Sequence, residues 1–187
     1  VWTSEAEPEP WSEVGQWTMA FLSPDAWQAQ WIAMPIHQIA SDAKWIWAVE
    51  GKKPTSVPPG PCRLQRSFEL PTSARVVTAQ LMVTADNSVK VTLNRELVAE
   101  STNWEEGVLV DVTAQLVAGS NTLDVLAING GTKNGPAGMI LQLRVELEDG
   151  REIVILSDQQ WRAALGEDPE VFGTATEIHP WGEGPWG

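Results

Sequence analysis

The chain has 187 residues, a formal net charge of −13 at pH 7, and a composition that is 43% hydrophobic and 20% charged. A chain of this size can bury a full core, so we expect one globular domain with an extension. The acidic charge argues against nucleic acid, whose phosphates are neutralised by Lys and Arg, and against anionic membrane surfaces. No apolar run approaches the roughly 20 residues that span a bilayer. Neutral ligands and divalent cations remain as partners.

The N-terminal part of the chain has little regular pattern. Residues 1–15 are rich in Pro and Glu and are predicted to form an arm. Their acidic start is unlike a signal peptide, so we expect either a cytoplasmic chain or a mature, excised piece of an exported one. Two related segments follow, AQWIA at 29–33 and AKWIW at 43–47, each with a β-favouring centre. Residues 52–61 hold four prolines and are predicted to be an irregular loop.

Alternation of apolar and polar residues then continues almost without a break, which predicts β-strands. The expected strands are 63–70, 75–85, 87–94, 96–100, 108–112, 121–128, 139–148 and 151–156. Asp149-Gly150, between the last two, is the strongest hairpin signal. Short strands with no long helical period predict an all-β fold, an antiparallel β-sandwich or jelly roll. We place the sandwich at residues 28–165, between an N-terminal arm (1–27) and a Trp- and Pro-rich C-terminal tail (166–187).

The aromatic and cysteine content is unusual. The chain has eleven Trp, no Tyr and one Cys. Trp offers a flat apolar face and one N–H donor, which suits a sugar ring. Most of the Trp residues lie towards the two ends of the chain, where we expect them to anchor the extensions onto the core. The single Cys62 cannot form an internal disulfide and is predicted to be a small residue at the edge of the core.

An Asp-Asn pair stands between two predicted strands, within the stretch VTADNSVKVTLN. Asp86 and Asn87 place a carboxylate and an amide side by side at a predicted loop tip. Such oxygen atoms can hold a hard cation or sugar hydroxyls. The alternative is turn chemistry, because Asp and Asn side chains also bond their own backbone at strand ends.

Two further loops carry candidate ligand residues. The first, residues 103–107, contains Trp104, which either stacks on a sugar ring or caps the sandwich. The second, residues 129–138, is glycine-rich and carries Asn129 and Asn134, either of which could orient hydroxyl groups. Asp, Asn and backbone carbonyl oxygens suit Ca²⁺. The coincidence of the three loops favours a binding site over three ordinary connections.

Recognisable catalytic motifs are missing from the sequence. It contains no HExxH, nucleophile-elbow or phosphate-loop pattern. His37 and His179 lie far apart, near the two ends of the chain. Glu105 and Glu106 are expected to be solvated charges rather than an acid–base pair. We therefore predict a binding module and not an enzyme.

The order of several short segments resembles the β-domains of bacterial α-L-rhamnosidases. The segments are LSPDAWQAQWI (22–32), RSFEL (66–70), AQLMVTADN (79–87), VTLN (91–94), DVT (111–113), GSN (119–121) and SDQQWR (157–162). Together they are similar to the N-terminal sugar-binding jelly roll of that family, a galactose-binding-domain-like sandwich, over roughly residues 22–165. The chain departs from the family at a hairpin, where Asn94-Arg95 replaces the usual Asn-Gly.

The resemblance implies specific roles for the candidate residues. In the family's rhamnose-binding modules an adjacent Asp-Asn pair helps to hold a calcium ion that contacts the sugar, and a Trp and a downstream Asn complete the pocket. The metal role would fall on Asp86 and Asn87. The remaining sugar contacts would fall on Trp104 and on Asn129 or Asn134.

The sequence thus leads to one hypothesis with two alternatives. The hypothesis is a non-catalytic carbohydrate-binding module of a larger bacterial glycan-degrading protein, secreted or periplasmic. It would bind a neutral sugar such as L-rhamnose, from a plant or microbial polysaccharide, with the help of Ca²⁺. The first alternative is a structural spacer that packs against neighbouring domains and has no ligand. The second is a small glycan lyase or hydrolase on a jelly roll.

Overall fold

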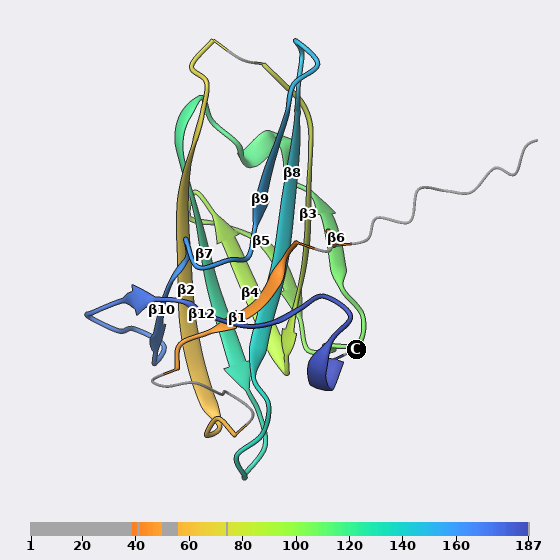
Figure 1. The fold of residues 1–187 in the computed structure, drawn as a ribbon. Helices are drawn as coiled ribbons and strands as arrows, with labels where there is room; N and C mark the ends of the chain where they lie inside the picture. The colour runs from red at the N-terminus through yellow and green to blue at the C-terminus, as the bar shows by residue number, and fades with distance from the viewer. Residues whose placement is uncertain (1–38, 41, 50–55, 74, 187) are drawn as a thin grey trace, which may run out of the picture. The chain divides into compact units, whose positions relative to one another are not determined.

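The computed structural model describes residues 39–40, 42–49, 56–73 and 75–186, and these form a β-protein (Figure 1). The strands are β1 (Lys44–Trp47), β2 (Gly60–Leu70), β3 (Val76–Asp86), β4 (Ser88–Leu93), β5 (Glu96–Ser101), β6 (Val108–Asp111), β7 (Gly119–Asn129), β8 (Gly138–Leu147), β9 (Glu152–Leu156), β10 (Arg162–Leu165), β11 (Gly173–Thr174) and β12 (Thr176–Pro180). Two short 3-10 turns are also present, η2 (Thr113–Gln115) and η3 (Gly184–Trp186). None of the described helices is long and apolar enough to cross a membrane.

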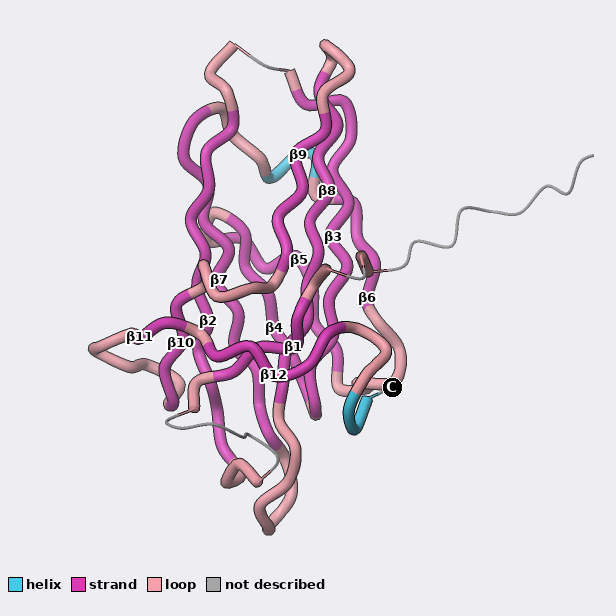
Figure 2. The backbone as a smooth tube through the Cα atoms, viewed as in Figure 1, coloured by secondary structure: helices cyan, strands magenta, loops and turns pink. Residues whose placement is uncertain are grey.

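The strands form two sheets that face each other, as Figures 1 and 2 show. The first sheet has the order β12-β1-β8-β3-β6, and β9 also pairs with β8. The second sheet has the order β11-β10-β2-β7-β4-β5. Every pairing between these strands is antiparallel. The predicted antiparallel sandwich is therefore confirmed.

The main core lies between the two sheets and follows the period-two alternation of the sequence. In β7, Leu123, Val125 and Ala127 are fully buried, while the residues between them face solvent at least in part. Val89 and Val91 of β4 are buried on the same inner face. Burial of one such aliphatic side chain contributes about 1.5–3 kcal/mol to stability. Alternation in the sequence thus correctly predicted which strand faces turn inward.

The beginning of β8 is buried on both faces, which alternation did not predict. Leu141 and Leu143 face the main core, and Ile140 faces a second cluster on the outside of the first sheet. We call this second group the outer cluster; its buried members are Ile39, Ala43, Trp45, Ile140 and Trp186. The cluster joins residues from both ends of the described chain. This agrees with the expectation that terminal Trp residues anchor extensions onto the core.

Most of the predicted strands agree with the structure, with small shifts at their ends. Gly60 and Pro61, expected in the irregular loop, are instead the first two residues of β2. Proline has no N–H to donate to a strand ladder, so it is tolerated at the beginning of a strand. The Gly119-Ser120 turn is instead part of β7, because β2 and β7 stay paired as far as Leu70–Gly119. The Asp149-Gly150 hairpin is confirmed, with Gly150 at a positive φ of 81°.

The C-terminal segment contributes to both sheets. Residues 166–187, for which a tail was expected, supply β11 to the edge of the second sheet and β12 to the edge of the first. β12 pairs with β1, so segments from opposite ends of the chain lie side by side (Figure 1). The predicted arm at 1–27 and the predicted strand-like segment at 29–33 lie outside the described residues.

Cys62 offers a direct test of this core. Its side chain is fully buried, and burial raises the pKa of the thiol from 9.0 to about 12. Because the thiolate is the reactive form, we expect a disulfide reagent such as DTNB at pH 8 to leave the native protein unmodified and to react once denaturant unfolds it. Labelling of the native protein at the rate of a free thiol would contradict this arrangement.

Candidate functional site

The three loops that carry the predicted site residues meet at one end of the sandwich, the lower end in Figure 1. Asp86 pairs with Gly138 in the β3–β8 register, which brings the first loop to the end of the third. The Thr84 hydroxyl donates to the Trp104 carbonyl at 2.8 Å, which ties the second loop to β3. Their predicted proximity follows from strand pairing.

We expected Asp86 at a loop tip, but it is the last residue of β3. The strand extends to it because Gly138 continues the ladder of β8. Its side chain is only 7% exposed, on the same outer face as Thr84. One carboxylate oxygen, Oδ2, accepts a hydrogen bond of 3.0 Å from the indole N–H of Trp186. The other oxygen, Oδ1, accepts no hydrogen bond from a described residue.

Asn87 is exposed and links the first loop to the third. Its backbone N–H donates to the carbonyl of Ile128 at 2.6 Å, and its side-chain Oδ1 accepts the backbone N–H of Gly130 at 2.6 Å. The peptide bond between Asp86 and Asn87 is cis. As expected for turn chemistry, the Asn87 side chain bonds a backbone N–H, but that N–H belongs to Gly130 in the third loop and not to the first loop itself. The Asn87 amide nitrogen has no partner among the described residues.

Asn129 and Asn134, the two candidates from the third loop, differ sharply. Asn129 ends β7 and is 4% exposed; its Nδ2 donates to the carbonyls of Val57 at 3.0 Å and Pro58 at 3.1 Å. Its Oδ1 is bonded by no described residue. Asn134 is exposed and makes no side-chain hydrogen bond within the described part of the chain. Asn129 is therefore held in place, whereas Asn134 is not.

Of the two roles weighed for Trp104, the structure supports that of a cap on the sandwich. The side chain is partly buried and packs against the outer cluster, so it does cover one end of the first sheet. Part of the residue remains open to solvent beside Thr84 and the end of β3. Its use as a stacking surface for a sugar stays a prediction.

Three of the predicted site residues share one hydrogen-bonding pattern. Asp86, Asn87 and Asn129 each bind the protein through one polar atom and leave the other without a described partner. The atoms left without a described partner are two acceptors, Oδ1 of Asp86 and Oδ1 of Asn129, and one donor, the amide nitrogen of Asn87. Among the described residues, no group of three or more His, Cys, Asp or Glu side chains is placed to hold a metal ion. Any cation here would therefore depend on amide and carbonyl oxygens as well as on Asp86.

Sequence reasoning missed two residues that touch this corner. Trp186 donates to Asp86, and Gly138 leaves room for its ring: a Cβ on Gly138 would lie 2.9 Å from Trp186 and 3.0 Å from Trp45. A single Trp within the otherwise small and polar ending GEGPWG was the available signal. Its partner could not be read from spacing, because the two residues are 100 positions apart.

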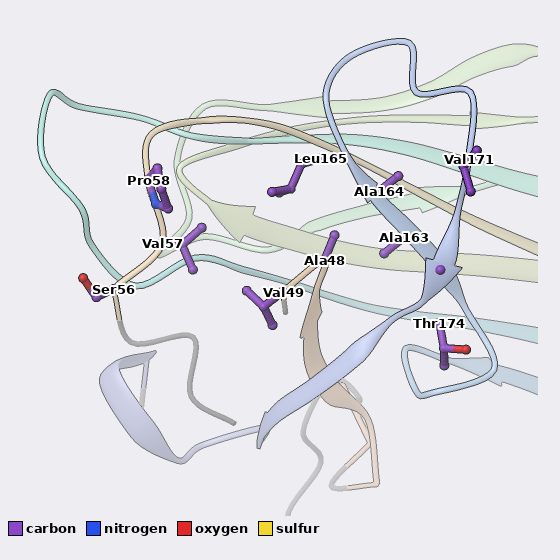
Figure 3. Close-up of a pocket in the computed structure, with 11 residues that line it drawn as sticks. Ala48, Val49, Ser56, Val57, Pro58, Ala163, Ala164, Leu165, Val171 and Thr174 are labelled. Atoms are coloured by element: carbon purple, nitrogen blue, oxygen red, sulfur yellow. The ribbon is translucent and has the colours of Figure 1, made fainter. Parts of the chain in front are cut away.

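A separate cavity of about 610 Å³ is lined by none of the five predicted site residues (Figure 3). Ala48 and Val49 line one side, and β10 and β11 line another. The lining is largely aliphatic, and Leu165 and Val171 at its edge are 59% and 79% exposed. This chemistry suits an apolar surface better than a sugar or a cation.

The contrast between Asn129 and Asn134 predicts different stability effects. Asn129→Ala removes two hydrogen bonds and leaves the carbonyls of Val57 and Pro58 without these partners, so we expect a loss of about 1–3 kcal/mol in the free energy of unfolding. Asn134→Ala should change it by less than about 0.5 kcal/mol. Urea unfolding of both variants measures this. Equal stability of the two variants would show that the Asn129 contacts are not made.

Comparison with known proteins places this geometry in a family context. No protein-family model matches the sequence. An α-L-rhamnosidase of Streptomyces avermitilis is 28% identical over an alignment that spans 100% of this chain and 20% of that enzyme. An α-L-rhamnosidase of Formosa agariphila is 27% identical over 96% of this chain and 21% of that enzyme. The chain thus spans about a fifth of the length of the curated relatives that it matches.

Solved structures agree with this relationship. The crystal structure of the S. avermitilis α-L-rhamnosidase in complex with L-rhamnose matches 88% of this chain and 17% of that chain, with a TM-score of 0.74 and 29% identity. A lectin from Pleurotus ostreatus matches 80% of this chain and 47% of that chain with a TM-score of 0.69, but at 19% identity it supports only the fold. The resemblance read from the sequence is confirmed: this β-sandwich chain is similar in sequence and in structure to part of α-L-rhamnosidases.

Proposed function

We propose that this domain is a non-catalytic carbohydrate-binding module of a larger glycoside hydrolase of the α-L-rhamnosidase type. It binds a neutral sugar at the corner formed by Asp86, Asn87 and Asn129. L-rhamnose is the first ligand to test, because the S. avermitilis relative was crystallised with it. The parent protein is secreted or periplasmic in this proposal, where it meets plant or microbial polysaccharide.

The observation that carries the proposal is that each of the three polar side chains has one polar atom bonded to the protein and another without a described partner. A side chain that only stabilises a turn directs its polar atoms into the fold. Asp86, Asn87 and Asn129 instead hold their positions through one atom each and keep a second atom without a described partner. Rigid side chains with spare hydrogen-bonding capacity are what a preorganised polyol site requires.

The donor set fits a calcium ion better than a transition metal. The available atoms are carboxylate, amide and backbone oxygens, which Ca²⁺ prefers. Asp86 would hold the ion through Oδ1, and Asn87 through the second lone pair of its Oδ1, which already accepts the Gly130 N–H. Backbone carbonyls, water or sugar hydroxyls would complete its six to eight ligands. With one carboxylate in the set, we expect a dissociation constant on the order of 10⁻⁴–10⁻³ M, as in extracellular modules. When bound, the ion would supply a positive charge that attracts sugar hydroxyl oxygens.

Trp104 supports the sugar side of the proposal. Its ring is fixed from one side by the outer cluster, so little conformational freedom is lost when a ligand packs on its open part. The net charge of −13 favours a neutral glycan over an acidic one. Asn129 is the better candidate than Asn134 for the remaining contact, because its position is fixed by two hydrogen bonds.

Titration calorimetry with Ca²⁺, followed by L-rhamnose with and without EDTA, tests the site. Asp86→Ala and Asp86→Asn are both expected to lose Ca²⁺ and sugar binding. The Asn variant keeps an acceptor for Trp186, so it separates loss of charge from loss of packing. Trp104→Ala should still bind Ca²⁺ but bind the sugar about tenfold more weakly, and Asn134→Ala serves as the matched control. Absence of binding by the unmodified protein to any neutral glycan would refute the proposal.

The aliphatic cavity favours a second candidate function, that of a structural spacer. Exposed Leu165 and Val171 beside a cavity of about 610 Å³ give a surface that a neighbouring domain of the parent enzyme could cover. In that case the domain packs against its neighbours and needs no ligand. The two functions are compatible in one domain, but only the first predicts a response to Ca²⁺.

Thermal unfolding distinguishes the two candidates. A ligand at about 100 times its dissociation constant stabilises a protein by about 2.7 kcal/mol, which for a domain of this size raises the Tm by roughly 5–10 °C. We expect that rise on adding Ca²⁺ and its reversal on adding EDTA. A Tm that is the same in both conditions would favour the spacer.

A further inference from the structure

We propose that Trp186 is a positioning residue for the ligand site, acting through the carboxylate of Asp86. The inference rests on the proposed function and adds to it that the C-terminal turn belongs to the site. Trp186 donates its indole N–H to Asp86 Oδ2 at 3.0 Å, and both groups are buried. This hydrogen bond sets the direction in which Oδ1, the other carboxylate oxygen, is presented.

The C-terminal turn has the features of a segment that is built to hold one ring in place. Residues 181–185 are all exposed, whereas Trp186 is 9% exposed. Gly184 lies at a φ of 74°, and a Cβ there would come within 2.5 Å of the His179 ring, so the tight turn depends on glycine. The backbone N–H of Trp181 donates to the Ala43 carbonyl at 3.3 Å. The turn is therefore fixed at its beginning and at its end.

The ring of Trp186 is also fixed on its faces. It stacks on Trp45 with ring centroids 4.4 Å apart and an angle of 23° between the planes. Gly138, the register partner of Asp86, leaves the space that the ring fills. Stacking thus determines where the indole lies, and the absent side chain at Gly138 lets it approach β3 closely enough to reach Asp86.

A carboxylate held in this way is a better ligand than a free one. Groups that hydrogen-bond to a metal-binding carboxylate orient it, and their removal commonly weakens metal affinity by about 10–100-fold. Asp86 is 7% exposed, so without the indole N–H its Oδ2 would be left in apolar surroundings without a described donor. We therefore expect ligand binding and the docking of residues 184–186 to strengthen each other, as linkage requires.

Trp186→Phe tests this inference, with Trp181→Phe as the matched control. Both changes remove an indole N–H from a ring that stacks on Trp45, but only Trp186 reaches Asp86. In calorimetry with Ca²⁺ alone, and then with L-rhamnose at saturating Ca²⁺, we expect Trp186→Phe to raise the dissociation constant about tenfold or more. Trp181→Phe should leave it within about twofold. The Tm of both variants is measured alongside, because a purely structural role would lower the Tm without changing affinity.

The unmodified protein gives a second readout that does not depend on a variant folding. In ¹⁵N NMR, saturating Ca²⁺ and L-rhamnose should slow hydrogen exchange of the Trp186 indole N–H and leave that of Trp181 unchanged. Faster exchange at Trp186 on ligand binding would overturn the inference, as would a Trp186→Phe variant that binds as well as the unmodified protein. If the unmodified protein binds neither Ca²⁺ nor any neutral sugar, the proposed function itself fails, and the inference fails with it.

Discussion

The antiparallel pairing of β3 with β8 is the interaction on which the candidate site depends. The ladder is continuous from Thr78–Glu146 to Asp86–Gly138. It places the end of the first loop directly beside the end of the third, although the two are about 50 residues apart in sequence. A slip of one residue would turn Asp86 to the inner face among the aliphatic core, where an unpaired carboxylate costs several kcal/mol. The register of this pair is therefore also what keeps the carboxylate at the site.

The outer cluster explains how a carboxylate can be both buried and available. A sandwich needs only its inner faces covered, and the outer face of an antiparallel sheet normally meets water. Here β1 and the C-terminal turn cover the start of β8 with Trp45, Ile140 and Trp186. The cover removes Asp86 from bulk water on one side, and the Trp186 N–H offsets part of the cost of that burial. Because of the same cover, we expect water to compete less with a ligand for Oδ1, the other carboxylate oxygen of Asp86.

The sequence predicted the strands well because their signal is local. Alternation identified the inward residues of β4 and β7, and Asp149-Gly150 identified a hairpin. It could not predict the double burial of β8, because alternation describes one strand and not what covers its outer face. Nor could it predict the contact of Asp86 with Trp186, since that contact depends on a turn packed across 100 residues. The convergence of three loops was predictable from topology. Which polar atom of each side chain bonds the protein, and which has no described partner, was not predictable.

Asn129 shows why it matters for specificity that one polar atom of a side chain is bonded to the protein and the other is not. If both ends of its amide were bonded to the fold, the residue would be structural; if neither were, it would be mobile, and ordering it would weaken binding. Its Nδ2 is held by the carbonyls of Val57 and Pro58, which fixes the side-chain plane and leaves Oδ1 in a defined direction. Asp86 is held by Trp186 in the same manner, and Asn87 by the backbone of Gly130. Three polar side chains are thus oriented by three different parts of the fold. The geometry of the site therefore depends on the packing of the whole sandwich and not on one flexible loop.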